Sequence, residues 1–242
     1  MPKLVYDFTE GNKDMKDLLG GKGANLAEMT NLGLPVPPGF IISTEACRHY
    51  LAQGSVPAGL DAEATEHLRR LEQAMGRSLG DPGDPLLVSV RSGAKFSMPG
   101  MMETVLNIGL SDASVYGLAK QAGNERFAWD SYRRLIQMFG KTVLGIEGHE
   151  FEQAIDAAKQ AKGSTNDLDL DAADMRALVD TFKQIVKSQT GEDFPQEPRA
   201  QMDMAVKAVF DSWNSDRAIL YRRQAIGRRN AACARHEGRQ AR

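Results

Sequence analysis

The chain has 242 residues, of which 42% are hydrophobic and 26% are charged, and its formal net charge is −2. This ordinary globular composition excludes an intrinsically disordered acidic tail, a collagen-like rod and a disulfide-stapled miniprotein. The two cysteines, Cys47 and Cys233, predict neither a disulfide framework nor a metal cluster. No apolar run approaches the roughly 20 residues of a membrane span, and the first residues lack a signal-peptide core. We therefore expect a cytoplasmic protein with no membrane partner.

The first part of the chain alternates between predicted strands and predicted helices. Short apolar or alternating stretches predict strands at 4–8, 39–43 and 85–91. Apolar residues at helical spacing predict helices at about 26–32, 44–53 and 61–79. Gly33 and Gly80 follow the first and the last of these helices as predicted C-terminal caps. The alternation indicates an α/β layer.

From residue 111 to about 215 the pattern becomes almost wholly helical. Apolar residues at helical spacing mark three helices in this stretch. They are Phe127, Leu135, Met138 and Phe139 in the first helix, Leu178, Phe182, Ile185 and Val186 in the second, and Met202, Val206, Val209, Phe210 and Trp213 in the third. The sequence therefore predicts an α+β protein in which a large helical insertion follows a small α/β part.

The last residues differ in composition from the rest of the chain. Residues 222–242 contain seven arginines and one acidic residue, Glu237, and they show no apolar period. A basic tail of this kind is typical of an arm that binds nucleic acid or an anionic surface. The alternative is an accidental ending, because out-of-frame reading of GC-rich DNA yields Arg, Ala and Gly.

The stretch 20–23, Gly-Gly-Lys-Gly, precedes the helix predicted at 26–32. Glycines let backbone N–H groups approach a phosphate, the helix N-terminus adds a positive end, and Lys22 adds a mobile charge. The stretch is no P-loop, because Gly23 stands where Ser or Thr is required, and no dinucleotide fingerprint, because Leu26 replaces the third glycine. The alternative is a tight turn before a helix, with a solvated lysine.

Arg91 ends the last of the predicted strands. Its guanidinium is suited to bidentate binding of phosphate oxygens at the carboxyl end of a strand, where ligands of open α/β sheets gather. A structural ion pair at the edge of the strand is the alternative. The following loop contains Met98, Met101 and Met102 around Gly100. It predicts either an adaptable lid over a base or ribose or a methionine-rich core plug.

Arg133 and Arg134 lie on the predicted helix that contains Phe127 and Leu135. One of the two arginines is a candidate for contact with a triphosphate, and the alternative is that both extend along the surface. The histidines show no partner pattern and are interpreted as surface or packing residues. They are His49, His67, His149 and His236. The sequence shows neither a Ser-His-Asp order nor a Cys/His zinc spacing.

Residues 3 to about 223 resemble the N-terminal ATP-binding region of the pyruvate, phosphate dikinase family. The stretches that carry the resemblance are long and colinear, at 18–29, 86–94, 97–104, 127–134, 194–198, 208–213 and 217–223. The form Arg91-Ser92-Gly93-Ala94 favours the dikinase over the related phosphoenolpyruvate synthase.

The resemblance implies an ATP-grasp architecture, in which a nucleotide lies between two subdomains. It also implies a reaction in which ATP, phosphate and pyruvate become AMP, diphosphate and phosphoenolpyruvate through a phosphohistidine. Lys22 and Arg91 match the phosphate-contacting lysine and arginine of the family. The other residues carried over as ATP-binding are Gly100, Met101, Met102, Thr104 and Arg134. No catalytic residue and no metal ligand is assigned.

The resemblance also divides the chain into four parts. They are an α/β nucleotide-binding subdomain at 1–110, a helical insertion at 111–197, a helix returning to the first subdomain at 198–223, and the basic tail at 224–242. We expect the second ATP-grasp subdomain, which would supply the ligands of the Mg²⁺ bound to ATP, to be missing. The phosphohistidine domain and the barrel that binds pyruvate or phosphoenolpyruvate are expected to be missing too. Complete dikinase activity is not expected from this chain alone.

The basic tail begins where the family should continue into its second subdomain. This favours a truncated or frameshifted ending over a nucleic-acid arm. Two alternatives to an incomplete dikinase stay open. One is a standalone nucleotide-binding or regulatory module, and the other is a nucleic-acid-binding protein that uses the tail.

Overall fold

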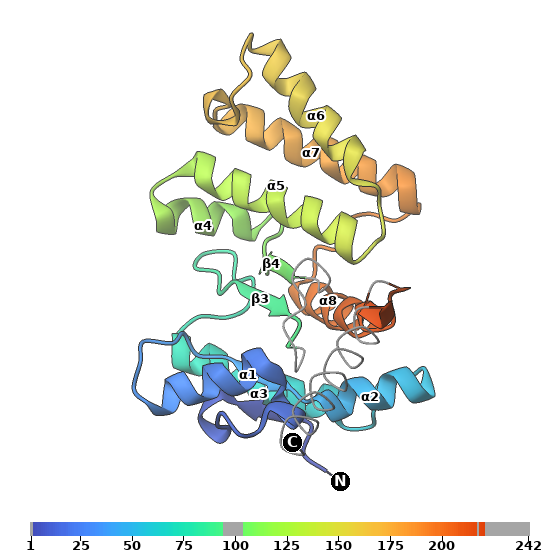
Figure 1. Cartoon of the computed structure of the whole chain (residues 1–242). Helices are drawn as coiled ribbons and strands as arrows, with labels where there is room; N and C mark the ends of the chain where they lie inside the picture. The colour runs from blue at the N-terminus through green and yellow to red at the C-terminus, as the bar shows by residue number, and fades with distance from the viewer. Residues whose placement is uncertain (1, 94–103, 217, 221–242) are drawn as a thin grey trace, which may run out of the picture.

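The computed structural model describes residues 2–93, 104–216 and 218–220. Helices dominate this part of the chain, with two small sheets beside them, so the protein is of the α+β class (Figure 1). The helices are α1 (Lys16–Asn31), α2 (Thr44–Gln53), α3 (Leu60–Met75), α4 (Ser114–Ala122), α5 (Glu125–Thr142), α6 (Gly148–Ala161), α7 (Ala172–Thr190) and α8 (Pro198–Ser212). The strands are β1 (Val5–Asp7), β2 (Phe40–Ile42), β3 (Val88–Arg91) and β4 (Thr104–Ile108). Two short 3₁₀ turns, η1 (Phe8–Glu10) and η2 (Asp167–Asp169), complete the elements.

The elements are arranged in tiers. In the view of Figure 1, α1, α2 and α3 form the lowest tier, β3, β4 and α8 lie above them, and α4 to α7 form the upper part. None of the helices that the structure describes is long and apolar enough to cross a lipid bilayer.

The strands pair as two separate antiparallel ribbons. β1 pairs with β2, with Val5 opposite Ile42, and β3 pairs with β4, with Arg91 opposite Thr104. The register of the second ribbon shifts between Val88 and Val90. The alternation of the sequence predicted an α/β layer, but the strands are too short and too few to form one. β3 and β4 are consecutive strands without a helix between them in the described chain, an order that favours antiparallel pairing.

The largest hydrophobic core lies in the upper part, around α5. Most of its large, fully buried side chains come from α5, α6 and α7, and Phe151 and Phe182 pack edge to face with ring centroids 4.9 Å apart. Phe139 of α5 packs in the same way on Phe194, at 5.4 Å. The helical spacing of apolar residues in the sequence predicted the buried face of α5. Phe127 is the exception, because its side chain is half-exposed. A second, smaller core joins α2 to α8 through Tyr50 and Phe210.

The predicted helix ends are confirmed where a local signal is unambiguous. α2 spans the predicted residues, with the Ser43 side chain accepting a hydrogen bond from the Ala46 N–H and with Gly54 in the left-handed conformation after it. α3 ends a turn earlier than predicted, because Gly76 already adopts φ +65° and closes the helix before Gly80 is reached.

Candidate functional site

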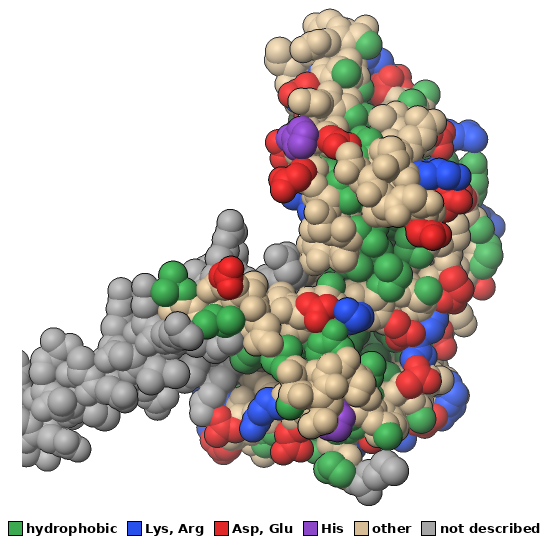
Figure 2. Space-filling view, turned by 90° about the vertical axis from the view of Figure 1, so that its right-hand side faces the viewer, with side chains coloured by type: hydrophobic (Ala, Val, Ile, Leu, Met, Phe, Trp, Pro, Cys, Tyr) green, Lys and Arg blue, Asp and Glu red, His purple; other side chains and the backbone are tan. Residues whose placement is uncertain are grey.

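A cavity of about 2050 Å³ opens between the lower tier and the middle tier. Its walls come from α1, α2, α3 and β2 on one side and from β3 and α8 on the other. Most of the lining side chains are apolar, but Lys22, Arg91 and Ser92 also line it. Figure 2, which views the molecule from its α2 and α8 side, shows hydrophobic side chains in the waist between the lower part and the helices above. The cavity thus combines largely apolar walls with polar and charged side chains, as small-molecule sites do.

Gly20 interrupts α1 next to this cavity. Its backbone has φ +70° and ψ 169°, a conformation outside the helical region, so that α1 consists of two helical pieces joined at Gly20. The sequence predicted a glycine turn before a helix at 26–32, and the break lies in the predicted stretch. Gly21, Lys22 and Gly23, however, already belong to the first turn of the second piece. The first N–H groups of a helix have no partner within it, so this turn is suited to an anion.

The break brings α1 against the end of β3. A Cβ added to Gly20 would lie only 1.4 Å from the carbonyl oxygen of Gly93, so the two backbones touch where a side chain would not fit. Lys22 lies two residues after Gly20, and Arg91 lies two residues before Gly93. The contact therefore holds the regions of Lys22 and Arg91 together at one cavity.

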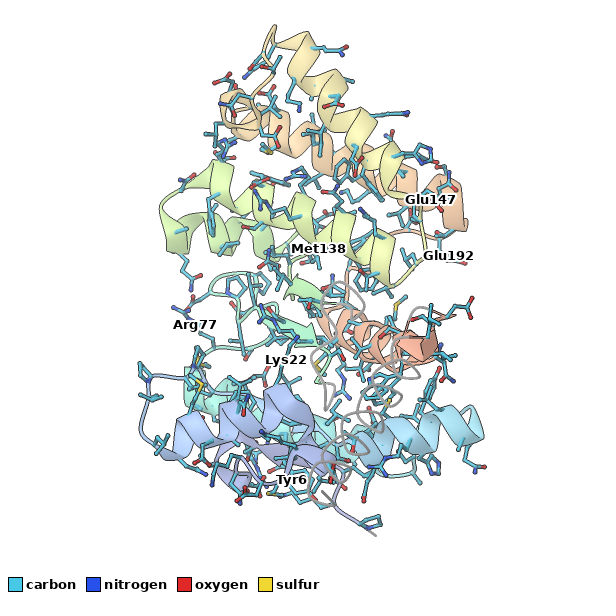
Figure 3. The ribbon with its side chains drawn as sticks, viewed as in Figure 1. Tyr6, Lys22, Arg77, Met138, Glu147 and Glu192 are labelled. Carbon is cyan, nitrogen blue, oxygen red and sulfur yellow. The ribbon has the colours of Figure 1, made fainter. Side chains whose placement is uncertain are left out.

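Lys22 and Arg91 are both exposed side chains with no ion pair to any acidic residue that the structure describes. In Figure 3, Lys22 lies at the edge of α1 that faces β3. Arg91 is the last residue of β3 and stands opposite Thr104 of β4. The strand belongs to an antiparallel ribbon, so the argument from the carboxyl ends of a parallel sheet does not apply to Arg91.

Two arginines that also line the cavity, Arg199 and Arg48, already bind other groups of the protein. Arg199 forms ion pairs with Asp61 and Asp203, at 2.5 and 2.9 Å. Arg48 donates hydrogen bonds to the Asp17 carbonyl oxygen and to the Thr44 hydroxyl. These arginines hold the walls of the cavity together, which distinguishes them from Lys22 and Arg91.

The structure places Arg133 and Arg134 elsewhere, on α5, and neither lines the cavity. Both bind Asp130, Arg133 through an Oδ1 contact of 2.6 Å and Arg134 through an Oδ2 contact of 2.9 Å. The Arg133 side chain is 7% exposed and lies over the ring of Phe182, whereas that of Arg134 is 62% exposed. The two arginines therefore do not both extend along the surface. The assignment of Arg134 to a nucleotide stays a prediction.

Of the loop residues predicted to contact a nucleotide, the structure describes only the last, Thr104. Gly100, Met101 and Met102 lie outside the described residues, as does the tail at 224–242. Thr104 is described as the first residue of β4, half-buried and opposite Arg91. The structure thus brings Thr104 beside Arg91, and its contact with a nucleotide stays a prediction.

Sequence reasoning missed Ser92, whose hydroxyl is buried next to Arg91 without a hydrogen-bond partner in the described structure. The sequence signal that could have indicated Ser92 is its position as a polar residue between the candidate cation Arg91 and Gly93.

His67 packs as expected, buried in contact with Phe40, with its Nδ1 2.6 Å from Asp7 Oδ1. Glu10 lies close to this pair, but none of the three residues lines the cavity. Although partial burial opposes ionisation, the hydrogen bonds from Lys3 and the Asp7 N–H lower the pKa of Glu10.

Comparison with known proteins shows one family and close relatives. The model of the pyruvate phosphate dikinase AMP/ATP-binding domain matches residues 16–64 and 55–232. The match therefore continues beyond residue 223, where the resemblance was expected to stop.

Pyruvate, phosphate dikinase of Clostridium symbiosum is 53% identical over 225 residues, which is 92% of this chain and 26% of that protein. Pyruvate, phosphate dikinase 2 of Zea mays is 54% identical over 93% of this chain and 26% of its own length. The chloroplastic pyruvate, phosphate dikinase of Mesembryanthemum crystallinum is 56% identical over 91% of this chain and 24% of its own length. The chain spans about a quarter of the length of these relatives.

Proposed function

The chain belongs to the pyruvate phosphate dikinase AMP/ATP-binding domain family, and from this we propose that it binds ATP in the cavity beside Gly20. Lys22 and Arg91 contact the phosphates, and the apolar walls surround the rest of the nucleotide. The observation that supports this most is the convergence on one cavity of two cations without ion pairs in the described chain. Phosphate oxygens are natural partners for such cations, because charge-assisted hydrogen bonds are stronger than neutral ones.

The names of the relatives support a broader proposal. As part of a longer protein, this chain would form one wall of an ATP-grasp nucleotide site in a pyruvate, phosphate dikinase. ATP, phosphate and pyruvate would there become AMP, diphosphate and phosphoenolpyruvate, with the smaller substrates bound by other parts of the protein. Phosphoryl transfer depends mainly on positioning and on stabilising charge, which is the role we give to Lys22 and Arg91. No residue of this chain is assigned a catalytic role.

The described residues of the cavity do not fit a magnesium ion. The carboxylates that line it are Asp17, Asp61 and Asp203. Arg199 binds the last two, and in the described chain the three are not gathered closely enough to hold one ion together. The group of three potential ligands in the described chain, Asp7, Glu10 and His67, does not line the cavity. Ligands for Mg²⁺ bound to ATP would therefore come from outside these residues, and no step is assigned to the metal.

We extend the proposal to the division of the chain. Residues 1–110 and 198–223 form the unit that contacts the nucleotide, and 111–197 form an inserted helical unit. Two segments connect the units, and Gln201 of α8 binds both through the Leu110 and Pro195 carbonyl oxygens, at 2.9 and 2.8 Å. The basic tail at 224–242 and a cytoplasmic location stay predictions.

Calorimetric titration of the chain with ATP, without Mg²⁺, tests nucleotide binding. We expect saturable binding, and we expect Lys22→Ala and Arg91→Ala each to weaken it by about ten-fold or more. Lys16→Ala and Arg77→Ala are matched controls, since both remove a cation of the same unit that does not line the cavity. Affinity unchanged in both test variants, or no heat with the parent chain, would contradict the proposal.

A further inference from the structure

The Ser92 side chain differs from other buried serines of this protein. It is 2% exposed, and its Oγ has no hydrogen-bond partner in the described structure. Ser114 is fully buried, but its hydroxyl donates to the Gly109 carbonyl oxygen at 2.8 Å and lies 3.2 Å from Ser111 Oγ. A buried hydroxyl without a partner has given up its hydrogen bonds to water and has formed none within the protein, so it destabilises the folded chain.

The position of Ser92 supplies a reason for this cost. It follows Arg91 directly, precedes the Gly93 carbonyl that touches Gly20, and lines the same cavity as Lys22. Ser92 therefore lies in the segment that joins Arg91 to the contact with the restarted helix α1, at the cavity that Lys22 also lines. A serine has three staggered χ1 rotamers, so rotation of this one bond redirects Oγ toward a bound oxygen.

We propose that Ser92 donates a hydrogen bond to a phosphate oxygen of the nucleotide, as a third phosphate-contacting side chain beside Lys22 and Arg91. This inference rests on the proposed function of the cavity. A hydroxyl adds what neither cation offers, a short directional donor without charge, and O–H donors to anionic oxygens form strong hydrogen bonds. The free chain keeps the hydroxyl unsatisfied, and the ligand satisfies it.

The proposal predicts opposite effects of one substitution on stability and on binding. Ser92→Ala removes an unsatisfied group, so the thermal midpoint of the ligand-free chain stays the same or rises. The same variant loses the hydrogen bond to phosphate, so its affinities for ATP and for inorganic tripolyphosphate fall about ten-fold or more. Its affinity for adenosine, which has no phosphate, stays that of the parent chain.

Two further variants make the test specific. Ser92→Cys keeps the shape of the side chain with a somewhat larger atom and offers only a weak donor, so it also weakens tripolyphosphate binding. Ser114→Ala is the matched control, because it removes a buried hydroxyl that has partners outside the cavity. It lowers the thermal midpoint and leaves the affinity for ATP unchanged.

The outcomes separate this proposal from the proposed function. If the parent chain binds ATP and tripolyphosphate, and both Ser92 variants bind them equally well, the role of Ser92 is wrong while the nucleotide site stands. If Ser92→Ala lowers the ligand-free midpoint as much as Ser114→Ala does, the hydroxyl has a structural role and the proposal is overturned. If the parent chain binds neither ligand, both proposals fail.

Discussion

The carbonyl oxygen of Gly93 occupies the space that a side chain on Gly20 would need, at 1.4 Å from the position of its Cβ. This contact joins the break in α1 to the end of β3. It depends on a residue without a side chain and on a positive φ, and glycine alone meets both requirements easily. The proximity of Lys22 to Arg91 at one cavity follows from this pair of glycines.

Substitution of Gly20 by alanine is therefore expected to affect both stability and binding. A strained φ and a clash that displaces the backbone combine to lower the free energy of unfolding by roughly 3 kcal/mol or more. Because the displacement separates Lys22 from Arg91, the affinity for ATP falls as well. Urea denaturation and calorimetric titration measure the two effects.

Gly33, just beyond the end of α1, provides the matched control. It has φ +73°, close to that of Gly20, but nothing lies within 4 Å of a Cβ added there. Gly33→Ala therefore keeps the strain and omits the clash, and we expect a loss of about 1 kcal/mol with no change in ATP affinity. Equal losses in the two variants would show that the contact with Gly93 contributes nothing.

Much of the local structure could be predicted from sequence, because its causes are local. The bounds of α2 follow from Ser43 and Gly54, which act within one turn of the helix. The end of α3 was misplaced because Gly76 and Gly80 are equally plausible caps in the sequence. Strand pairing could not be predicted, since β1 meets β2 only after the chain has passed through α1.

The candidate site likewise has features that depend on the local sequence, which could be predicted, and features that depend on packing, which could not. Lys22 and Arg91 stood out by their local patterns, but their common cavity depends on the contact between Gly20 and Gly93, which are distant in sequence. Only the family resemblance could join them beforehand. The buried state of the Ser92 hydroxyl could not be predicted at all, because burial and missing partners are properties of packing.

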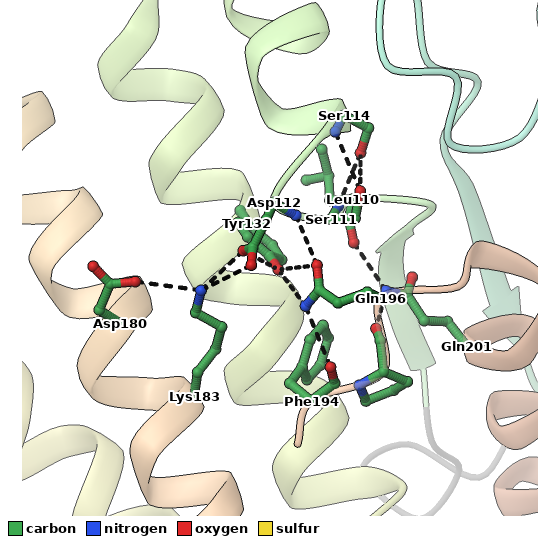
Figure 4. A network of polar contacts seen from close by, with 11 residues as sticks. Leu110, Ser111, Asp112, Ser114, Tyr132, Asp180, Lys183, Phe194, Gln196 and Gln201 are labelled. Atoms are coloured by element: carbon green, nitrogen blue, oxygen red, sulfur yellow. Dashed lines mark hydrogen bonds and ion pairs between the residues drawn. The ribbon is translucent and has the colours of Figure 1, made fainter.

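Gln201 is expected to be among the most sensitive polar residues of the fold. Its fully buried amide accepts a hydrogen bond from the Gly109 N–H at 3.0 Å. It also donates to the carbonyl oxygens of Leu110 and Pro195 (Figure 4). Gln201→Leu removes the partner of all three backbone groups and leaves those of Gly109 and Leu110 buried without one, so the free energy of unfolding falls by roughly 2–4 kcal/mol. Gln73→Leu, at an exposed position of α3, is expected to change it by less than about 0.5 kcal/mol. Chemical denaturation compares the two, and similar small effects would contradict the role given to Gln201.

Asp171 is expected to make the N-terminus of α7 sensitive to acid. The hydrogen bond from Lys162, with those from the Asp174 and Ala173 N–H groups, lowers the pKa of this carboxyl to about 2. Because the folded pKa lies below the unfolded value, the ionised group stabilises the folded chain above about pH 4. This contribution is lost as the pH falls from about 4 toward 2.

Thermal unfolding between pH 2 and pH 6 measures this dependence. Asp171→Asn keeps an oxygen that caps the helix but removes the titrating group, so its midpoint is expected to fall less steeply in that interval than the parent midpoint. Asp14→Asn, at an exposed carboxyl outside the helices, is the control and is expected to follow the parent curve. Parallel curves for the parent chain and Asp171→Asn would contradict the assignment.

Arg133 and Arg134 share Asp130 but differ in burial, so they form a natural pair for comparison. Arg133→Ala leaves the half-buried Asp130 with a single exposed partner and opens space over Phe182, and we expect a loss of roughly 2–4 kcal/mol of unfolding free energy. Arg134→Ala removes an exposed ion pair, which is worth at most about 1 kcal/mol. Since Arg134→Ala leaves the fold intact, titration of this variant with ATP is a direct test of the role predicted for Arg134. Weaker binding would confirm that role, and unchanged binding would restrict the phosphate contacts to the cavity that contains Lys22 and Arg91.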